Sequence, residues 1–123
     1  MIHTTVANND VGIMNTGTLT LAGTLVADGC EQSTVTSNGY NIQSPGDTCG
    51  FNQGTDRVDV SAEDLKLEPL ADNGGPTMTH ALLPGSVAID VIPADMCEVE
   101  TDQRGEPRPG GAMCEVGAFE VQP

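Results

Sequence analysis

Short apolar runs separated by turn-forming residues constrain this chain more than any other feature of its sequence. In residues 18–21 apolar and polar side chains alternate, so Leu19 and Leu21 face a core while Thr18 and Thr20 face water. Fifteen Gly and eight Pro supply turns, and with no Trp, one Tyr and two Phe the core must consist mainly of Val, Leu, Ile and Ala. The pattern predicts one small all-β domain with little helix.

Further short strands are predicted in both halves of the chain. The N-terminal half has such runs at 25–27, 34–36, 40–42 and 58–60. The C-terminal half has a strand at 77–82, with Met78, His80 and Leu82 on one face, and a last strand at 116–121.

One helical turn is predicted between these halves, at residues 61–65. Ser61 is a suitable N-cap because Asp64 follows three residues later, and Pro69 prevents a long helix. Beyond it, residues 73–76 and 83–86 predict two reversals of the chain.

A weak internal repeat indicates a solenoid. At an offset of 23 residues it aligns Asn15 with Asn38, Leu19 with Ile42 and Gly23 with Gly46. Asn and Gly suit tight corners because both tolerate left-handed backbone conformations, and periods of about 20 to 50 residues are typical of solenoids. A β-sandwich with similar hairpins remains the alternative.

Acidic residues dominate the charge of the chain, with eighteen Asp and Glu against four Lys and Arg and a formal net charge of −14. That balance argues against binding nucleic acid, which requires a cationic face, and against binding anionic membranes. It favours solubility, with Ca²⁺ binding as an alternative for which Asp47, Asp56 and Asp59 are weak candidates near turns. The sequence has no EF-hand spacing, and no other metal or cofactor is predicted.

Four cysteines form two close pairs along the sequence, Cys30 with Cys49 and Cys97 with Cys114. An even number in a loop-rich chain indicates disulfides and an oxidising compartment, and local pairing is preferred because each bridge then closes a loop within one structural unit. Free thiols and a zinc site remain as alternatives, although the chain has no Cys-x-x-Cys. Residues 1–5 lack the basic start and apolar core of a secretory signal, and no apolar stretch has the roughly 20 residues of a membrane span.

Four ordered motifs run through residues 72–105, namely Asp72-Asn-Gly-Gly-Pro-Thr77, His80-Ala-Leu-Leu-Pro-Gly-Ser86, Ala88-Ile-Asp90 and Thr101-Asp-Gln-Arg-Gly105. Together with segments 12–21 and 37–42 they make residues 12–121 resemble the choice-of-anchor Q domain, found at the C-terminal end of bacterial parallel β-helix surface proteins. Val87, where that family more often has Pro, and residues 91–93 depart from its pattern. The resemblance implies a short right-handed parallel β-helix with coils in 1–60 and a capping module in 61–123. It also implies an extracellular or cell-surface setting and no established catalytic residues.

Residue types that occur in hydrolytic triads lie near one another in the sequence, at His80, Ser86 and Asp90. No nucleophile elbow surrounds Ser86, so a structural role for His80 is favoured. Cleavage of polysaccharides on a β-helix would require carboxylates that converge on a groove. With about two coils and a net charge that repels polyanions, we predict no enzyme activity and no catalytic residue. The strand candidates for such a groove would be Asp28, Asp56, Asp59 and Asp64.

Arg104 stands in a polar turn, where its planar guanidinium is suited to a fixed pairing with a carboxylate. Asp90 and Asp102 are the candidate partners in a structural clamp that ties the C-terminal segment to the body. Binding of an acidic sugar is the alternative role.

The N-terminal end of the expected solenoid lacks an evident cap. Each coil of a solenoid buries its face on its neighbours, and the chain begins almost directly in the apolar run 2–6. We therefore expect homo-oligomerisation through this end, most simply as a two-fold dimer. The leading function is that of a non-catalytic structural or adhesive surface module. A carbohydrate-binding module is the alternative, and a remnant of a polysaccharide-active enzyme is a further one.

Overall fold

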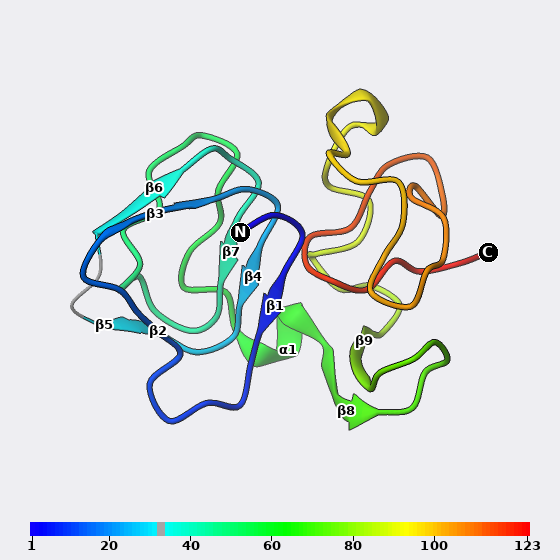
Figure 1. Cartoon of the computed structure of the whole chain (residues 1–123), viewed down its shortest axis with the longest axis horizontal. Helices are drawn as coiled ribbons and strands as arrows, with labels where there is room; N and C mark the ends of the chain where they lie inside the picture. The colour runs from blue at the N-terminus through cyan, green and yellow to red at the C-terminus, as the bar shows by residue number, and fades with distance from the viewer. Residues whose placement is uncertain (32–33) are drawn as a thin grey trace.

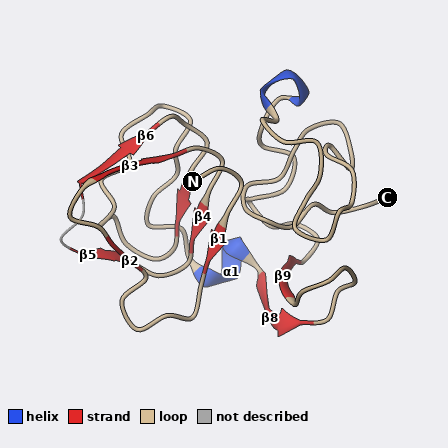
Figure 2. Cartoon of the chain, viewed as in Figure 1, coloured by secondary structure: helices blue, strands red, loops and turns tan. Residues whose placement is uncertain are grey.

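The computed structural model describes residues 1–31 and 34–123, which form short strands, turns and irregular loops (Figure 1). The helical elements among these residues are the single turn α1 (Ala62–Leu65) and the 3₁₀ turn η1 (Ala94–Met96), as Figure 2 shows. The chain is therefore all-β, as its short alternating runs predict. Its strands are β1 (Thr5–Val6), β2 (Ile13–Met14), β3 (Thr18–Leu21), β4 (Leu25–Val26), β5 (Cys30–Glu31), β6 (Thr34–Ser37), β7 (Ile42–Gln43), β8 (Leu67–Ala71) and β9 (Thr79–Leu82).

The first seven strands pair in three parallel ladders. These ladders have the orders β1-β4-β7, β2-β5 and β3-β6. The chain visits them in the same order twice and then returns to the first with β7. We call residues 1–21 the first layer, 22–37 the second and 38–60 the third; the successive layers lie side by side on the left of Figure 1.

The spacing between paired residues differs from the expected repeat. Thr5 pairs with Leu25 and Leu25 with Ile42, offsets of 20 and 17 residues. The predicted offset of 23 is therefore wrong, and Leu19 lies opposite Val35 rather than Ile42. Strand pairing sets the register, and corners of unequal length change the spacing from one layer to the next. Matches between Asn and Gly residues at corners therefore do not reveal which strand residues pair.

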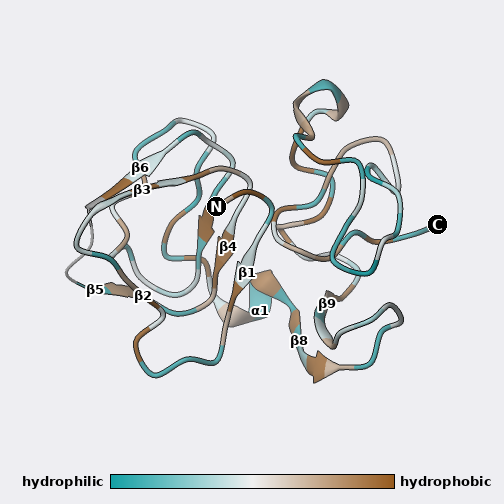
Figure 3. Cartoon of the chain, in the orientation of Figure 1, coloured by the Kyte–Doolittle hydropathy of each residue, from teal (hydrophilic) through white to brown (hydrophobic). Residues whose placement is uncertain are grey.

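Strand β4 lies between the two apolar clusters of the core because successive side chains of a strand point to opposite faces. Leu25 belongs to the cluster that joins the layers to residues 61–123, and Val26 to the cluster within the layers. Figure 3 shows the hydrophobic colouring of this strand. In β3 the expected alternation is confirmed: Leu21 is buried and Leu19 half-buried, while the two threonines are exposed.

The C-terminal segment, residues 61–123, begins with the predicted helical turn. The Ser61 Oγ accepts a hydrogen bond from the Asp64 N–H at 3.1 Å, which confirms the N-cap. Strands β8 and β9 then form an antiparallel hairpin. Because β9 starts at Thr79, Met78 lies outside the strand and is exposed, whereas Leu82 is buried.

Two predicted strands, 58–60 and 116–121, are loops in the structure. Asp59 has a φ of 51°, a left-handed conformation that interrupts an extended run. At the other segment, the backbone N–H groups bond to scattered acceptors, carboxylates among them, rather than to one neighbouring strand. The Glu120 N–H donates to Asp102 Oδ2 at 3.0 Å, and the Val121 N–H donates to Glu115 Oε2 at 2.7 Å.

Both predicted disulfides are present, Cys30–Cys49 in the layers and Cys97–Cys114 in the C-terminal segment. They leave no free cysteine, so the thiol and zinc alternatives are excluded. Two disulfides indicate an oxidising, extracellular-type environment. None of the helices among the described residues is long and apolar enough to cross a lipid bilayer.

Gly117 brings the C-terminal segment into direct backbone contact with the layers. Its N–H donates to the Gly23 carbonyl at 2.9 Å, and the next N–H, of Ala118, donates to Thr5 Oγ1 at 2.9 Å. Gly117 has a φ of 101°, and a Cβ there would lie 2.6 Å from Thr5 Oγ1. Only glycine permits this approach.

Candidate functional site

His80, Ser86 and Asp90 do not form a catalytic triad. His80 Nδ1 lies 2.8 Å from the Glu68 carbonyl, the Ser86 hydroxyl donates to the Leu65 carbonyl, and Asp90 Oδ1 accepts from the Met113 N–H. Each side chain is bonded to a different stretch of backbone. Each of these contacts holds a turn or a hairpin, and none of them pairs a nucleophile with a base.

The acidic residues considered for a groove or for Ca²⁺ mostly stabilise loops. Asp28 accepts from the Asn9 side chain at 2.9 Å, and Asp56 accepts from the Ser37 hydroxyl at 2.6 Å and from the N–H groups of Asn41 and Gln53. Asp59 accepts from the Gly46 N–H; Asp47 and Asp64 are exposed. Within residues 1–31 and 34–123, no three His, Cys, Asp or Glu side chains are grouped as metal ligands would be.

Arg104 is paired with Asp102, one of its two expected partners. Its Nε and Nη2 both donate to Asp102 Oδ2, at 3.0 and 2.9 Å, and Nη2 also donates to the Glu120 carbonyl at 2.6 Å. The expected pairing with Asp90 is wrong, because Asp90 lies in a different loop, where it bonds to Met113. The guanidinium also lies 3.9 Å over the ring of Phe119.

Asp102 is buried at the centre of this clamp. Burial alone would raise the pKa of its carboxyl. Hydrogen bonds from the Glu120 N–H, the Arg104 guanidinium and the N–H groups of Arg104 and Glu106 outweigh burial and lower the pKa of Asp102 below its usual value. The carboxylate therefore organises the loop around it in its ionised form.

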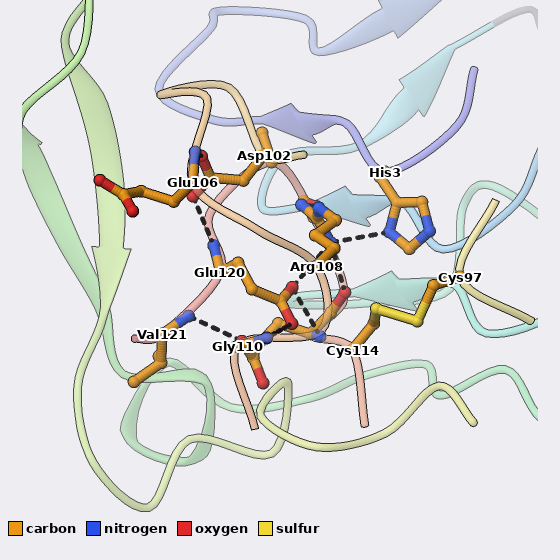
Figure 4. Close-up of polar contacts among 12 residues, drawn as sticks. His3, Cys97, Asp102, Glu106, Arg108, Gly110, Cys114, Glu120 and Val121 are labelled. Atoms are coloured by element: carbon orange, nitrogen blue, oxygen red, sulfur yellow. Dashed lines mark hydrogen bonds and ion pairs between the residues drawn. A yellow bond between two sulfur atoms is a disulfide. The ribbon is translucent and has the colours of Figure 1, made fainter. Parts of the chain in front are cut away.

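A second clamp, centred on Arg108, is absent from the sequence-based predictions (Figure 4). Its side chain and that of Glu120 are both 0% exposed, and Nη1 lies 2.9 Å from Glu120 Oε2. The guanidinium also donates to the carbonyls of Gly117 at 2.6 Å and Glu115 at 3.2 Å, and Nη1 lies 3.0 Å from His3 Nδ1. Arg108 thus joins the first residues of the chain to the C-terminal loops.

Two titratable groups border this pair. Burial and the charge of Arg108 lower the pKa of His3 to about 4, against the opposing effect of the Glu115 carbonyl. Burial raises the pKa of Glu115 to about 7. The hydrogen bonds from the N–H groups of Asp90 and Val121 act to lower this pKa, whereas the nearby Glu120 carboxylate acts to raise it. Beside the Arg108–Glu120 pair, His3 is therefore neutral at pH 7 and Glu115 is only partly ionised.

A cleft of about 720 Å³ lies between the layers and the C-terminal segment, and it is larger than two further hollows of about 140 and 20 Å³. One wall is the open end of the first layer, formed by β1, β2 and β3 with Val6, Ile13 and Leu19. The other wall is the C-terminal segment with Leu70, Met78 and Phe119. We call it the open-end cleft, and its volume lies within the roughly 300–1,000 Å³ of small-molecule sites.

Sequence reasoning did not identify the residues of this cleft as a group. The signal for this cleft is the exposure of apolar side chains, which is seen only in the structure. Leu70 and Met78 are 52% and 53% exposed. No family model, curated protein or solved structure matches this chain.

Proposed function

We propose that this chain is a non-catalytic structural module with an adhesive function. In this proposal the three layers are coils of a short right-handed parallel β-helix, similar to that of choice-of-anchor Q domains. The observation that carries it is the strand order, since the chain visits three parallel ladders in the same order twice and then returns to the first. A chain that repeats one circuit builds successive coils, and parallel crossovers are right-handed in about 98% of cases.

The two clamps support a capping role for residues 61–123. Arg104–Asp102 and Arg108–Glu120 are nearly or fully buried ion pairs, and each also binds backbone carbonyls. Such pairs hold an irregular segment in one arrangement where regular secondary structure does not. A cap of this kind protects one end of a solenoid from water.

The contacts of the catalytic candidates support a non-catalytic role. His80 and Ser86 are each bonded to a backbone carbonyl, and Asp90 accepts from a backbone N–H. The two disulfides support a role outside the cytosol, as on a bacterial surface.

An adhesion assay tests this function. Beads coated with the folded, oxidised protein should be retained under flow on polysaccharide-coated or cell-derived surfaces, and beads coated with an Arg108→Ala variant should detach. Release of new reducing ends from polysaccharides by the purified protein would contradict the non-catalytic assignment. Detachment of wild-type beads from every surface would contradict the adhesive one.

A further inference from the structure

The open-end cleft has no acidic or basic side chain in a strongly acidic protein; its charged group is the Met1 ammonium, which donates to the Thr20 carbonyl at 2.8 Å. None of its seventeen lining residues is Asp, Glu, Lys or Arg. Charged residues make up 18% of the chain, so seventeen residues drawn at random would include about three. With no charged side chain in the lining to form an ion pair, the cleft favours a neutral ligand.

Two amide side chains of the cleft each keep a hydrogen-bond acceptor free. Gln103 uses its Nε2 to donate to Thr77 Oγ1 at 2.8 Å and to the Met78 carbonyl, and Asn9 uses its Nδ2 for Asp28 and the Ala7 carbonyl. Among the described residues, no hydrogen bond reaches Gln103 Oε1 or Asn9 Oδ1. Two amide oxygens thus remain for a ligand.

His80 adds a third acceptor. A carbonyl can only accept, so the 2.8 Å contact with the Glu68 carbonyl assigns the proton of the neutral imidazole to Nδ1. Nε2 then carries a lone pair, and no residue in the described ranges donates to it. These three acceptors favour a ligand that supplies several donors.

Apolar side chains line the cleft together with these acceptors. Leu70 and Met78 form part of one wall together with Phe119, whose ring is held by the Arg104 guanidinium over one face. Sugars present apolar C–H faces bordered by hydroxyl groups, and each hydroxyl can rotate to donate to an acceptor. An extended peptide presents backbone carbonyls as well as N–H groups. Carbonyls that face the acceptors of the cleft would find no hydrogen-bond donor there.

We propose that the open-end cleft binds a neutral oligosaccharide through the acceptors of Asn9, His80 and Gln103 and the apolar surface around Phe119. The inference deepens the adhesive function proposed above and rests on it, since the sugar would be the ligand through which the module adheres. A second copy of this chain is the competing occupant, because homo-oligomerisation is expected through the same end. The overhanging wall of Leu70 and Met78 makes this end concave, and two concave ends do not stack on each other.

An NMR titration of the intact, disulfide-bonded protein tests the proposal. Neutral hexasaccharides built from glucose, mannose, galactose or N-acetylglucosamine are compared with hexagalacturonate and with an uncharged hexapeptide. At least one neutral sugar should shift the side-chain amide signals of Gln103 and Asn9, and hexagalacturonate should shift neither.

Three variants locate the binding. Leu70→Asp adds a carboxylate to the cleft wall and should weaken binding at least tenfold, whereas Leu83→Asp, at 44% exposure and outside the cleft, should change it less than twofold. Gln103→Ala removes one acceptor and should weaken binding about tenfold. The Leu83 variant is the matched control because the residue change is the same and the exposure is similar.

Four results would overturn the inference: no binding of any neutral sugar, shifts confined to residues outside the cleft, preferential binding of the peptide, or equal affinities of Leu70→Asp and wild type. Concentration-dependent broadening of the cleft signals without sugar would assign the cleft to a second copy and overturn it as well. The bead assay separates the two proposals. If Leu70→Asp beads adhere like wild type, the sugar site fails and the adhesive function stands.

Discussion

Replacement of Arg108 by Met should remove a large share of the stability of the protein. The guanidinium is completely buried and is bonded to Glu120, to the carbonyls of Gly117 and Glu115, and to His3. Methionine fills much of the same volume but has no donor. Glu120 then loses its cationic partner and keeps the N–H groups of Gly110 and Glu115 as donors.

The size of the effect follows from the burial of the partner left behind. Removing one member of a buried ion pair costs about 3–5 kcal/mol, because the other charge stays uncompensated. Small domains have a free energy of unfolding of about 5–15 kcal/mol, so the loss amounts to about a fifth or more. An added Glu120→Gln change removes the buried charge and should restore part of the loss.

Urea denaturation with both disulfides intact measures these free energies. Arg57→Met is the control, since Arg57 is exposed and forms only backbone hydrogen bonds; it should change the free energy of unfolding by less than about 0.5 kcal/mol. If Arg108→Met and Arg57→Met differ by less than about 1 kcal/mol, the reasoning from the buried pair is refuted.

Three further predictions concern pH, a disulfide and a glycine. Glu115 has a pKa of about 7 in the folded protein against 4.5 as its ordinary value, so its contribution to stability is complete below 4.5 and is lost as the pH rises through 7. Glu115→Gln should remove that fall, measured between about pH 6.5 and 8; folded His3 is neutral there, and unfolded His3, with its ordinary pKa of 6.5, loses its remaining proton over this range in wild type and variant alike. An unchanged slope in urea titrations would contradict the assignment. Replacing both Cys97 and Cys114 with Ser opens a loop with a sequence separation of 17 and should cost about 3 kcal/mol, seen as a lower Tm by circular dichroism. Gly117→Ala should cost more than about 2 kcal/mol because of its φ of 101° and the contact with Thr5, whereas Gly54→Ala, with no atom within 4 Å of its Cβ, should be nearly neutral.

Several local features were predictable because they depend on neighbouring residues alone. The alternation of residues 18–21, the Ser61 cap and the short spacing within each cysteine pair all lead to the structure observed. Their physical basis is the two-residue period of a strand, the hydrogen bond from the cap to the first turn, and the short loop that a local disulfide closes.

The partner of each charge was less predictable. Arg104 pairs with Asp102, two residues away, and not with Asp90, although either carboxylate suits a guanidinium. Arg108, placed between two prolines in a glycine-rich stretch, has the sequence context of a solvent-exposed turn, yet it is fully buried. Burial depends on which loops pack over a residue, and local sequence does not specify that.

The sequence by itself determined the strand-and-turn character, the helical cap, the cysteine pairs and the acidic charge, since each follows from residues close together along the chain. The tertiary structure decided the register of the layers, the burial of Arg108 with Glu120 and the wall that makes the open end a cleft. These features depend on contacts between residues as far apart as His3 and Arg108. Such contacts exist only once the layers have stacked and the C-terminal segment has docked on them, because the free energy of burial and pairing arises in the assembled interior.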